Sequence, residues 1–374
     1  MTQIYSFWRS TGMFAALLLC LLCTNLSAGT IYVQTNLVSN VPGLAPTTDP
    51  NLINPWGVSF APKSPFWVSD QGTNLATLYD GAGNIKSLVV SVGPTPGPTG
   101  QVFNGTSSFG LPDGSPAVFL FSTLAGTLDA WNPGIIPITT SITVATTPGA
   151  VYTGLANGSV GMANYLYAAD VTGHINVFDT NFTNVTSTTF AGKFVDPSPV
   201  AGFTPFGIQN INGNLFVMYA QLKGVIGQPG GFVDEFDTSG NFIKRIATNG
   251  PLFAPWGITM APSRFGQFSG DLLIGQFGNG EILAYDPVTD AFLGTLNGKN
   301  GMPIVNDFLW SLEFRTAGPM ISTNALYFTA GIDNQMGGLF GEIAPAPEPG
   351  TITLLIAAAS SLAGRTLWRL KRNL

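Results

Sequence analysis

The chain has 374 residues, of which 45% are hydrophobic and only 9% charged, with a formal net charge of −6. This composition excludes a disordered protein, because disordered chains combine low hydrophobicity with many charges. It also argues against nucleic acid as a partner, since phosphate binding needs clustered Lys and Arg side chains. The length allows one large domain or two ordinary ones.

Residues 1–28 have the pattern of a secretory signal peptide. Arg9 precedes an apolar run over residues 13–23, and small and polar residues follow. That order is typical of a segment that is cleaved during export. Both cysteines, Cys20 and Cys23, lie in this segment. The exported body would therefore contain no disulfide, thiolate metal site or cysteine nucleophile.

The body, residues 29–344, repeats a unit of about fifty residues. The stretch "NPWGVSFAP" around Trp56 returns as "APWGITMAP" around Trp256, and "TPFGIQN" around Phe206 is a third copy. Phe206, Trp256 and Trp310 follow one another at intervals of 50 and 54 residues. After each opening come short β-rich runs separated by Gly, Asn and Asp, which is typical of an all-β fold.

About six such units fill the body. Radially arranged four-stranded units of ~40–50 residues are the blades of a β-propeller. The sequence therefore predicts an all-β, six-bladed β-propeller. The β-rich stretch "TIYVQTNLVSN" from Thr30 has no blade of its own. We expect it to pair beside residues 339–343 of the last blade and close the ring, because this pairing removes an open sheet edge.

The C-terminal segment has three parts in a fixed order. A Pro-rich linker over residues 345–350 leads into an apolar run within residues 351–374, which we expect to form a transmembrane helix, and a basic tail follows. Positive charges stay on the cytoplasmic side, so this segment would hold the body outside. The linker contains the tripeptide Pro347, Glu348 and Pro349, and the tail contains Arg365, Arg369, Lys371 and Arg372.

This tail resembles the PEP-CTERM sorting signal of exported bacterial proteins, and an ordinary C-terminal membrane anchor is the alternative. The blade openings resemble those of NHL-type propellers. Together with "FWVSDQGTNLATLYDG", they resemble a family of exported bacterial propellers of uncharacterised function. The resemblance implies an exosortase-type sorting enzyme as a partner. It also implies a membrane-anchored stage before processing, and then a place at the cell surface or in the extracellular matrix.

The blade entrances supply the candidate binding residues. In a propeller the first strand of each blade lines the central channel, and the loop entering it lies at one mouth. Trp56, Phe206, Trp256 and Trp310 all occupy this entrance, so we expect them to gather at one end of the axis. Exposed rings there would stack on sugar rings. The alternative, which the sequence favours, is that each ring packs between neighbouring blades.

The repeat also resembles, loosely, the six-bladed lactonase family, which holds Ca²⁺ or Zn²⁺ on the axis. In that family a ligand Asn precedes the Gly of the strand opening, where this chain has aromatic residues. No cofactor is therefore expected, although the sequence leaves a structural Ca²⁺ open. Asp70, Asp170 and Asp333, near the ends of second strands, are weak metal candidates, and capping of turn N–H groups is their alternative role.

Catalysis has little support in the sequence. His174, the only histidine, lies in a turn, where an exposed side chain is the ordinary case. Asn-x-Ser/Thr matches occur at Asn104 and Asn157 but carry little meaning in a bacterial host. The residues favour an exported binding or structural module for an extracellular polysaccharide or a protein partner. The alternative is an extracellular hydrolase or lactonase-like enzyme, which would need paired carboxylates or a metal on the axis.

Overall fold

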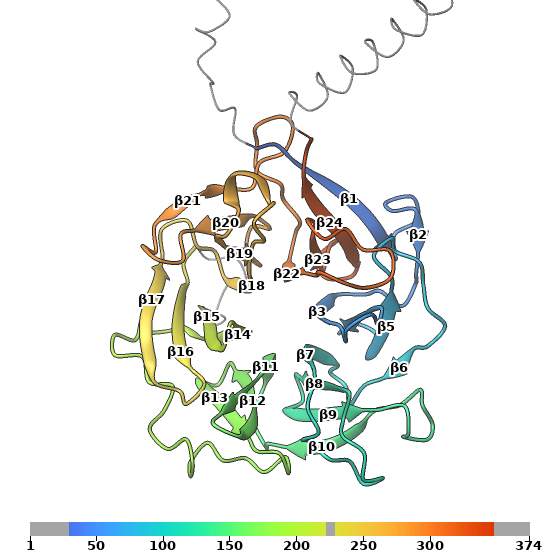
Figure 1. The fold of residues 1–374 in the computed structure, drawn as a ribbon, viewed down its shortest axis with the longest axis vertical. Helices are drawn as coiled ribbons and strands as arrows, with labels where there is room; N and C mark the ends of the chain where they lie inside the picture. The colour runs from blue at the N-terminus through green and yellow to red at the C-terminus, as the bar shows by residue number, and fades with distance from the viewer. Residues whose placement is uncertain (1–29, 222–228, 348–374) are drawn as a thin grey trace, which may run out of the picture. The chain divides into compact units, whose positions relative to one another are not determined.

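The computed structural model describes residues 30–221 and 229–347, which form six β-sheets set round one axis (Figure 1). Apart from one 3₁₀ helix, η1 (Gly266–Phe268), the described elements are strands. The sheets follow one another in chain order, so each sheet is one blade of a six-bladed β-propeller. The fold predicted from the repeat is confirmed.

The first three blades come from consecutive strands, each antiparallel to its neighbour in the sheet. Blade 1 contains β3 (Pro55–Ser59), β4 (Phe66–Asp70), β5 (Leu75–Tyr79) and β6 (Val90–Ser91). Blade 2 contains β7 (Pro98–Phe103), β8 (Phe119–Thr123), β9 (Thr127–Trp131) and β10 (Ile142–Thr146). Blade 3 contains β11 (Tyr152–Val160), β12 (Ala163–Asp170) and β13 (His174–Phe178). Blade 3 thus departs from the four-stranded pattern that the repeat predicts.

The other three blades complete the ring. Blade 4 contains β14 (Thr204–Ile211), β15 (Asn214–Ala220), β16 (Phe232–Asp237) and β17 (Phe242–Thr248). Blade 5 contains β18 (Pro255–Met260), β19 (Leu272–Gln276), β20 (Ile282–Tyr285) and β21 (Phe292–Thr295). Blade 6 contains β22 (Leu309–Phe314), β23 (Leu326–Ala330) and β24 (Leu339–Pro345), and then β1 (Tyr32–Ser39) and β2 (Thr47–Thr48) from the start of the body.

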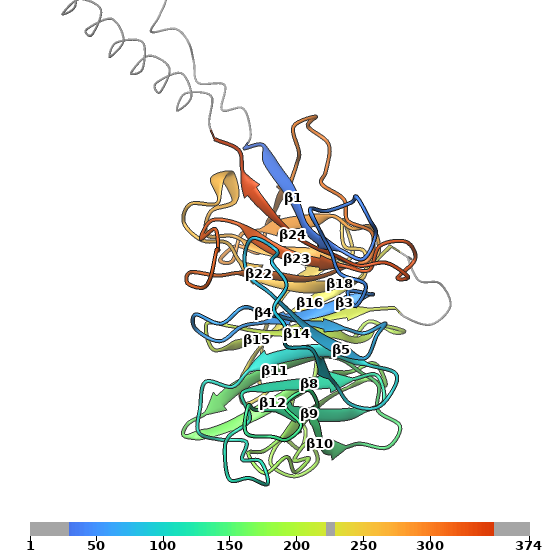
Figure 2. The same ribbon diagram turned by 90° about the vertical axis from the view of Figure 1, so that its right-hand side faces the viewer.

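The ring closes through the N-terminal strand. β1 pairs antiparallel with β24, from Ser39 opposite Leu339 to Tyr32 opposite Pro345. Figures 1 and 2 both show the two strands side by side. The predicted pairing of the two ends of the body is therefore confirmed. The Tyr32 hydroxyl also donates a buried hydrogen bond of 2.8 Å to the Phe265 carbonyl of blade 5, so β1 ties two blades together.

The middle strands of the blades are buried because the neighbouring blades cover both of their faces. Every residue of β4 ("FWVSD") and of β8 ("FLFST") is buried. Such strands are continuous runs rich in aromatic and β-branched residues rather than alternating patterns. The core accordingly consists of apolar clusters between adjacent blades.

Inner strands of neighbouring blades approach closely at the glycine of the openings of blades 1 to 5, while blade 6 has Ser311 at this position. A Cβ atom on Gly57 would lie 2.5 Å from the Thr99 carbonyl oxygen of blade 2. A Cβ on Gly207 or Gly257 would likewise collide with a carbonyl oxygen of the next inner strand. The repeated Pro-x-Gly motif therefore has a steric reason, because only a residue without a side chain leaves room for the neighbouring backbone.

Two predicted segments lie outside the described residues: the signal peptide, residues 1–28, and the transmembrane helix within residues 351–374. Of the predicted sorting tripeptide, only Pro347 is described. Within residues 30–221 and 229–347, no helix is long and apolar enough to cross a membrane.

Candidate functional site

The four aromatic side chains predicted at the blade entrances meet in one cluster. Trp56 stacks on Trp310, with ring centroids 3.5 Å apart and an interplanar angle of 20°. Trp256 stands edge-on to both, at 6.1 Å from Trp56 and 5.4 Å from Trp310. Phe206 lies 5.8 Å from Trp310, and Phe277, which the sequence did not single out, lies 4.4 Å from it. The entrances of blades 1, 4, 5 and 6 thus converge on the axis.

These rings are packed against one another rather than open to solvent. The exposed fractions of the four predicted side chains lie between 1% and 8%. The Trp310 indole N–H donates to Asn54 Oδ1 at 3.1 Å, and the Trp256 indole N–H donates to the Thr153 carbonyl at 3.0 Å. The packing alternative therefore describes this geometry, while a ligand-stacking role for these rings stays a prediction. The buried Trp56 indole N–H has no hydrogen-bond partner.

A small cavity lies on the axis beside the aromatic cluster. Its volume is about 20 Å³, which is room for about one water molecule. Inner strands line it, and its polar side chains include Gln101, Gln209 and Glu313. Gln209 Nε2 donates to Glu313 Oε1 at 3.3 Å across the axis. Burial raises the pKa of Glu313 to about 8, although the Gln209 hydrogen bond acts in the opposite direction. The sequence analysis missed this carboxyl group, which follows Trp310 by three residues.

The hydrolase alternative requires paired carboxylates or a metal on the axis. Among the described residues lining the axial cavity, Glu313 is the only one with a carboxyl group. In the same described part of the chain, no three His, Cys, Asp or Glu side chains lie together as a metal site would need. The described lining of the axial cavity therefore contains one carboxyl group and not the pair that a general acid and a second carboxylate would form.

Two of the three Asp candidates have local hydrogen-bonding roles. Asp70 is buried and accepts a hydrogen bond of 2.7 Å from Thr77 Oγ1, and its burial raises its pKa well above the ordinary value. Asp170 accepts hydrogen bonds from the backbone N–H groups of Val151 (3.1 Å) and Thr172 (2.9 Å). The capping alternative accounts for Asp170, which closes the turn between β12 and β13.

Asp333 and His174 lie apart from these groups. Asp333 has a φ of +53° in the turn between β23 and β24, where its carbonyl oxygen accepts a hydrogen bond from the Met336 N–H. His174 begins β13 and is exposed. Asp70, Asp170 and Asp333 belong to blades 1, 3 and 6. They do not meet at one point, because no three His, Cys, Asp or Glu side chains of the described residues lie together.

A polar pocket of about 380 Å³ lies at the opposite ends of the inner strands from the aromatic cluster. Blades 2, 3 and 4 line it with amide and hydroxyl side chains and with one buried ring, Phe109. These residues are Asn104, Thr106, Asn157, Ser159, Asn164, Asn210 and Thr238, with Gly158 and Gly213. No ionisable side chain is among the described residues that line this pocket.

Hydrogen bonds hold the polar pocket in shape. Asn157 Nδ2 donates to the Phe103 carbonyl of blade 2 at 2.9 Å, and Asn210 Nδ2 donates to the Asn157 carbonyl of blade 3 at 2.8 Å. Asn164 Nδ2 donates to Ser108 Oγ at 2.9 Å. The sequence analysis noted Asn157 only as part of an Asn-x-Ser/Thr match. A repeated Asn at the end of consecutive inner strands, here Asn157 and Asn210, is the signal that could have revealed the pocket.

The fold and its pockets define a six-bladed propeller with aromatic packing at the starts of its inner strands and a neutral polar pocket at their opposite ends.

No known family model matches the chain. The chain is 32% identical over 325 residues to an uncharacterized protein of Acanthamoeba polyphaga mimivirus, covering 82% of this chain and 78% of that protein. A second uncharacterized protein of the same virus is 30% identical over 325 residues, covering 82% and 84%. The chain belongs to the family of these viral proteins.

Solved structures resemble the chain in fold. A glucose dehydrogenase matches 84% of this chain and 100% of its own with a TM-score of 0.52 at 12% identity. A streptogramin B lyase matches 84% of this chain and 97% of its own with a TM-score of 0.47 at 12% identity. At such low identity the likeness concerns the propeller fold alone.

Proposed function

We propose that the chain is a binding module for a neutral, polyhydroxylated ligand such as a stretch of polysaccharide, held in the polar pocket. The observation that carries the proposal is a lining of amides and hydroxyls from three blades that contains no ionisable side chain among its described residues. Amide groups both donate and accept hydrogen bonds, as sugar hydroxyls do. The volume of about 380 Å³ falls within the ~300–1,000 Å³ typical of small-molecule pockets.

Preorganisation supports the same proposal. The pocket's amides are already oriented by bonds to neighbouring strands, so a ligand would not have to order them. The axial cavity, at about 20 Å³, is far too small for a sugar, so the enzyme alternative is not favoured.

A double variant tests the pocket. Thr106→Ala with Asn164→Ala removes two polar groups from the pocket, and we expect the affinity for a neutral glycan identified on an array to fall about tenfold. Isothermal titration calorimetry of the purified protein measures the change. Asn300→Ala, an exposed turn residue outside the pocket, is the matched control and should bind like the wild type. Equal affinity of all three proteins would contradict the proposal.

We also propose that the module works outside the cell, anchored through its C-terminal segment and then sorted to the cell surface or matrix by an exosortase-type enzyme. The signal-peptide pattern of residues 1–28 and the tripeptide, apolar run and basic tail of residues 345–374 support this proposal. Deleting residues 347–374 should move the body from the cell fraction into the medium, as measured by immunoblotting. A truncated chain that stays cell-bound would rule out the tail as the anchor.

A further inference from the structure

Blade 3 lacks the outer strand that the other blades have. In blades 1, 2, 4 and 5 the third strand pairs with a fourth, and in blade 6 β24 pairs with β1. Blade 3 ends at β13. The chain that follows bonds to the last residues of β13: the Val185 N–H donates to the Val177 carbonyl, and the Val177 N–H donates to Thr186 Oγ1, both at 2.8 Å.

The chain then leaves blade 3 and lies against blade 4. We call residues 185–203 the crossing segment. Within it, the Phe194 N–H donates to the Gly240 carbonyl, in the turn between β16 and β17, at 2.8 Å. The segment that could have formed the fourth strand of blade 3 is therefore bound to its neighbour.

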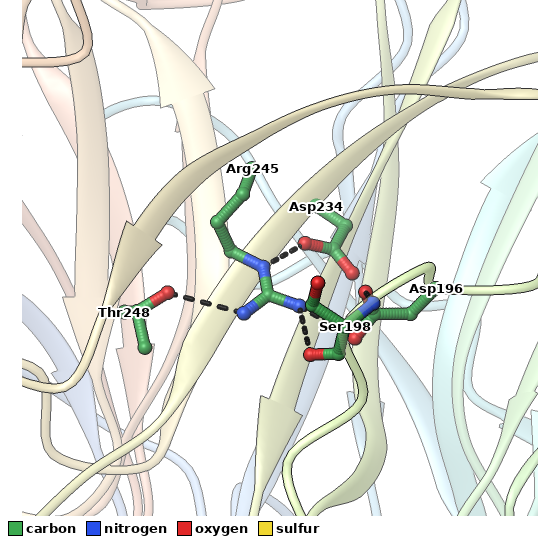
Figure 3. Close-up of polar contacts among 5 residues, drawn as sticks. All are labelled: Asp196, Ser198, Asp234, Arg245 and Thr248. Carbon is green, nitrogen blue, oxygen red and sulfur yellow. Dashed lines mark hydrogen bonds and ion pairs between the residues drawn. The ribbon is translucent and has the colours of Figure 1, made fainter.

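Arg245 of β17 holds the crossing segment in this place (Figure 3). One guanidinium nitrogen, Nη2, lies 2.5 Å from Asp196 Oδ2 and also donates to the Ser198 carbonyl at 3.3 Å. Its Nε donates to Asp234 Oδ1 on β16. The guanidinium thus connects the crossing segment to blade 4 through two carboxylates, and it also lies 4.1 Å from the Phe232 ring centroid.

A pocket of about 230 Å³ lies between β13 and the crossing segment. Its walls are mainly apolar, with Tyr219 and Phe232 stacked at 4.2 Å on the side of blade 4 and Ile175 on the side of blade 3. Apart from the Tyr219 phenol, Asp196 is the only ionisable side chain among the described residues that line it. The pocket therefore suits an apolar side chain with a positive charge close by.

The outer edge of β13 borders this pocket at Ile175, whereas residues 184–186 already bond to the last two residues of the strand. In an antiparallel sheet the N–H and C=O groups of an edge strand point outward at every second residue. The backbone N–H and C=O groups of Val177 point outward from the sheet, because they bond to the crossing segment. Ile175, two residues earlier, has the same orientation and lines the pocket. A strand laid here would find both hydrogen-bonding groups and a side-chain pocket.

We propose that this edge binds an extended peptide segment of a partner protein, which pairs with β13 at Ile175, next to the place where residues 185 and 186 bond to Val177. The segment would place an apolar side chain in the pocket and a Lys or Arg beside Asp196. Pairing along an exposed sheet edge supplies backbone hydrogen bonds, and the pocket for alternate side chains supplies specificity. The local charge favours a basic residue in the peptide, because two carboxylates share the single positive charge of Arg245. The whole chain also carries a net charge of −6.

A phage-displayed library of random ten-residue peptides, selected on the purified full chain, tests the proposal. We expect enriched sequences that place an apolar residue next to Lys or Arg and that bind as synthetic peptides with micromolar Kd. Hydrogen exchange measured by mass spectrometry should show slower exchange at residues 173–177 when the peptide is bound. Slower exchange elsewhere, or a library without enriched binders, would overturn the proposal.

A pair of tryptophan variants locates the binding site. Val195→Trp should fill the pocket and weaken the peptide at least about tenfold, because Val195 lines the pocket and is 61% exposed. Val288→Trp, at a valine 83% exposed in blade 5, is the matched control and should bind like the wild type. Equal binding by both variants would overturn the proposal. The proposal would also be overturned if the chain self-associated and the peptide dissociated it, because the occupant of the edge would then be a second copy of the chain.

Discussion

Replacing Arg245 by Met is expected to lower the free energy of unfolding by about 3 kcal/mol at pH 8, because Asp234 is then left buried without a cation. Asp234 is fully buried, and its Oδ2 has no hydrogen-bond partner even in the wild type. Arg245 therefore supplies the charge that makes this buried carboxylate tolerable. Urea denaturation of the purified protein measures the difference.

The effect should depend on pH, and its sign follows from the pKa of Asp234. Burial raises this pKa to about 6, although Arg245 lowers it in part. Because the folded-state pKa lies above the unfolded value of about 3.9, the contribution of this carboxyl is most favourable at low pH and is lost as pH rises through about 6. Without Arg245 the pKa rises further. The cost of Arg245→Met should therefore be much smaller at pH 5 than at pH 8.

Two further variants separate the buried charge from the loss of a surface ion pair. Arg245→Met with Asp234→Asn should recover most of the lost stability, because no buried charge remains. Lys244→Met breaks the partly exposed pair of Lys244 with Asp290 and should cost about 1 kcal/mol or less, on the scale of a surface ion pair. An equal loss at both pH values, with no recovery in the double variant, would show that Asp234 is not the cause.

The blades, the ring closure and the meeting of the aromatic side chains could all be predicted from the repeat. Residues at one position of a repeat lie at one end of the axis, so Trp56, Phe206, Trp256 and Trp310 had to converge. Whether their faces were exposed depended on how closely four inner strands approach, and the spacing of a motif does not report that distance. The aromatic rings are buried because Gly57, Gly207 and Gly257, which follow three of the four aromatic residues, allow that close approach.

The other features escaped prediction because they depend on contacts between different blades. The polar pocket combines residues of blades 2, 3 and 4, and Glu313 meets Gln209 only across the axis. The segment that follows the three strands of blade 3 contacts blade 4 through Asp196 and Arg245, which are 49 residues apart in the chain. Asp196 belongs to a segment with no strand pattern, so nothing in the local sequence indicates its partner. Local pattern carries little information on such pairings.

Replacing Gly257 by Ala is expected to lower the free energy of unfolding by about 3 kcal/mol, the upper part of the range for overpacked sites. The new Cβ would collide with the Trp310 carbonyl oxygen and lie 3.2 Å from the Leu312 backbone nitrogen, both in the next inner strand. Neither atom can move without shifting the backbone of β22. Thermal unfolding followed by circular dichroism measures the loss.

The same substitution should also disturb the aromatic cluster, because β18 carries Trp256 and β22 carries Trp310. Pushing the two strands apart would separate rings that now lie 5.4 Å from each other, and the near-ultraviolet circular dichroism should weaken. Gly110→Ala is the matched control, since no atom lies within 4 Å of its added Cβ, and it should change stability by less than about 0.5 kcal/mol. If Gly257→Ala and Gly110→Ala unfolded at the same temperature, close approach of the inner strands could not be the reason for the repeated glycine.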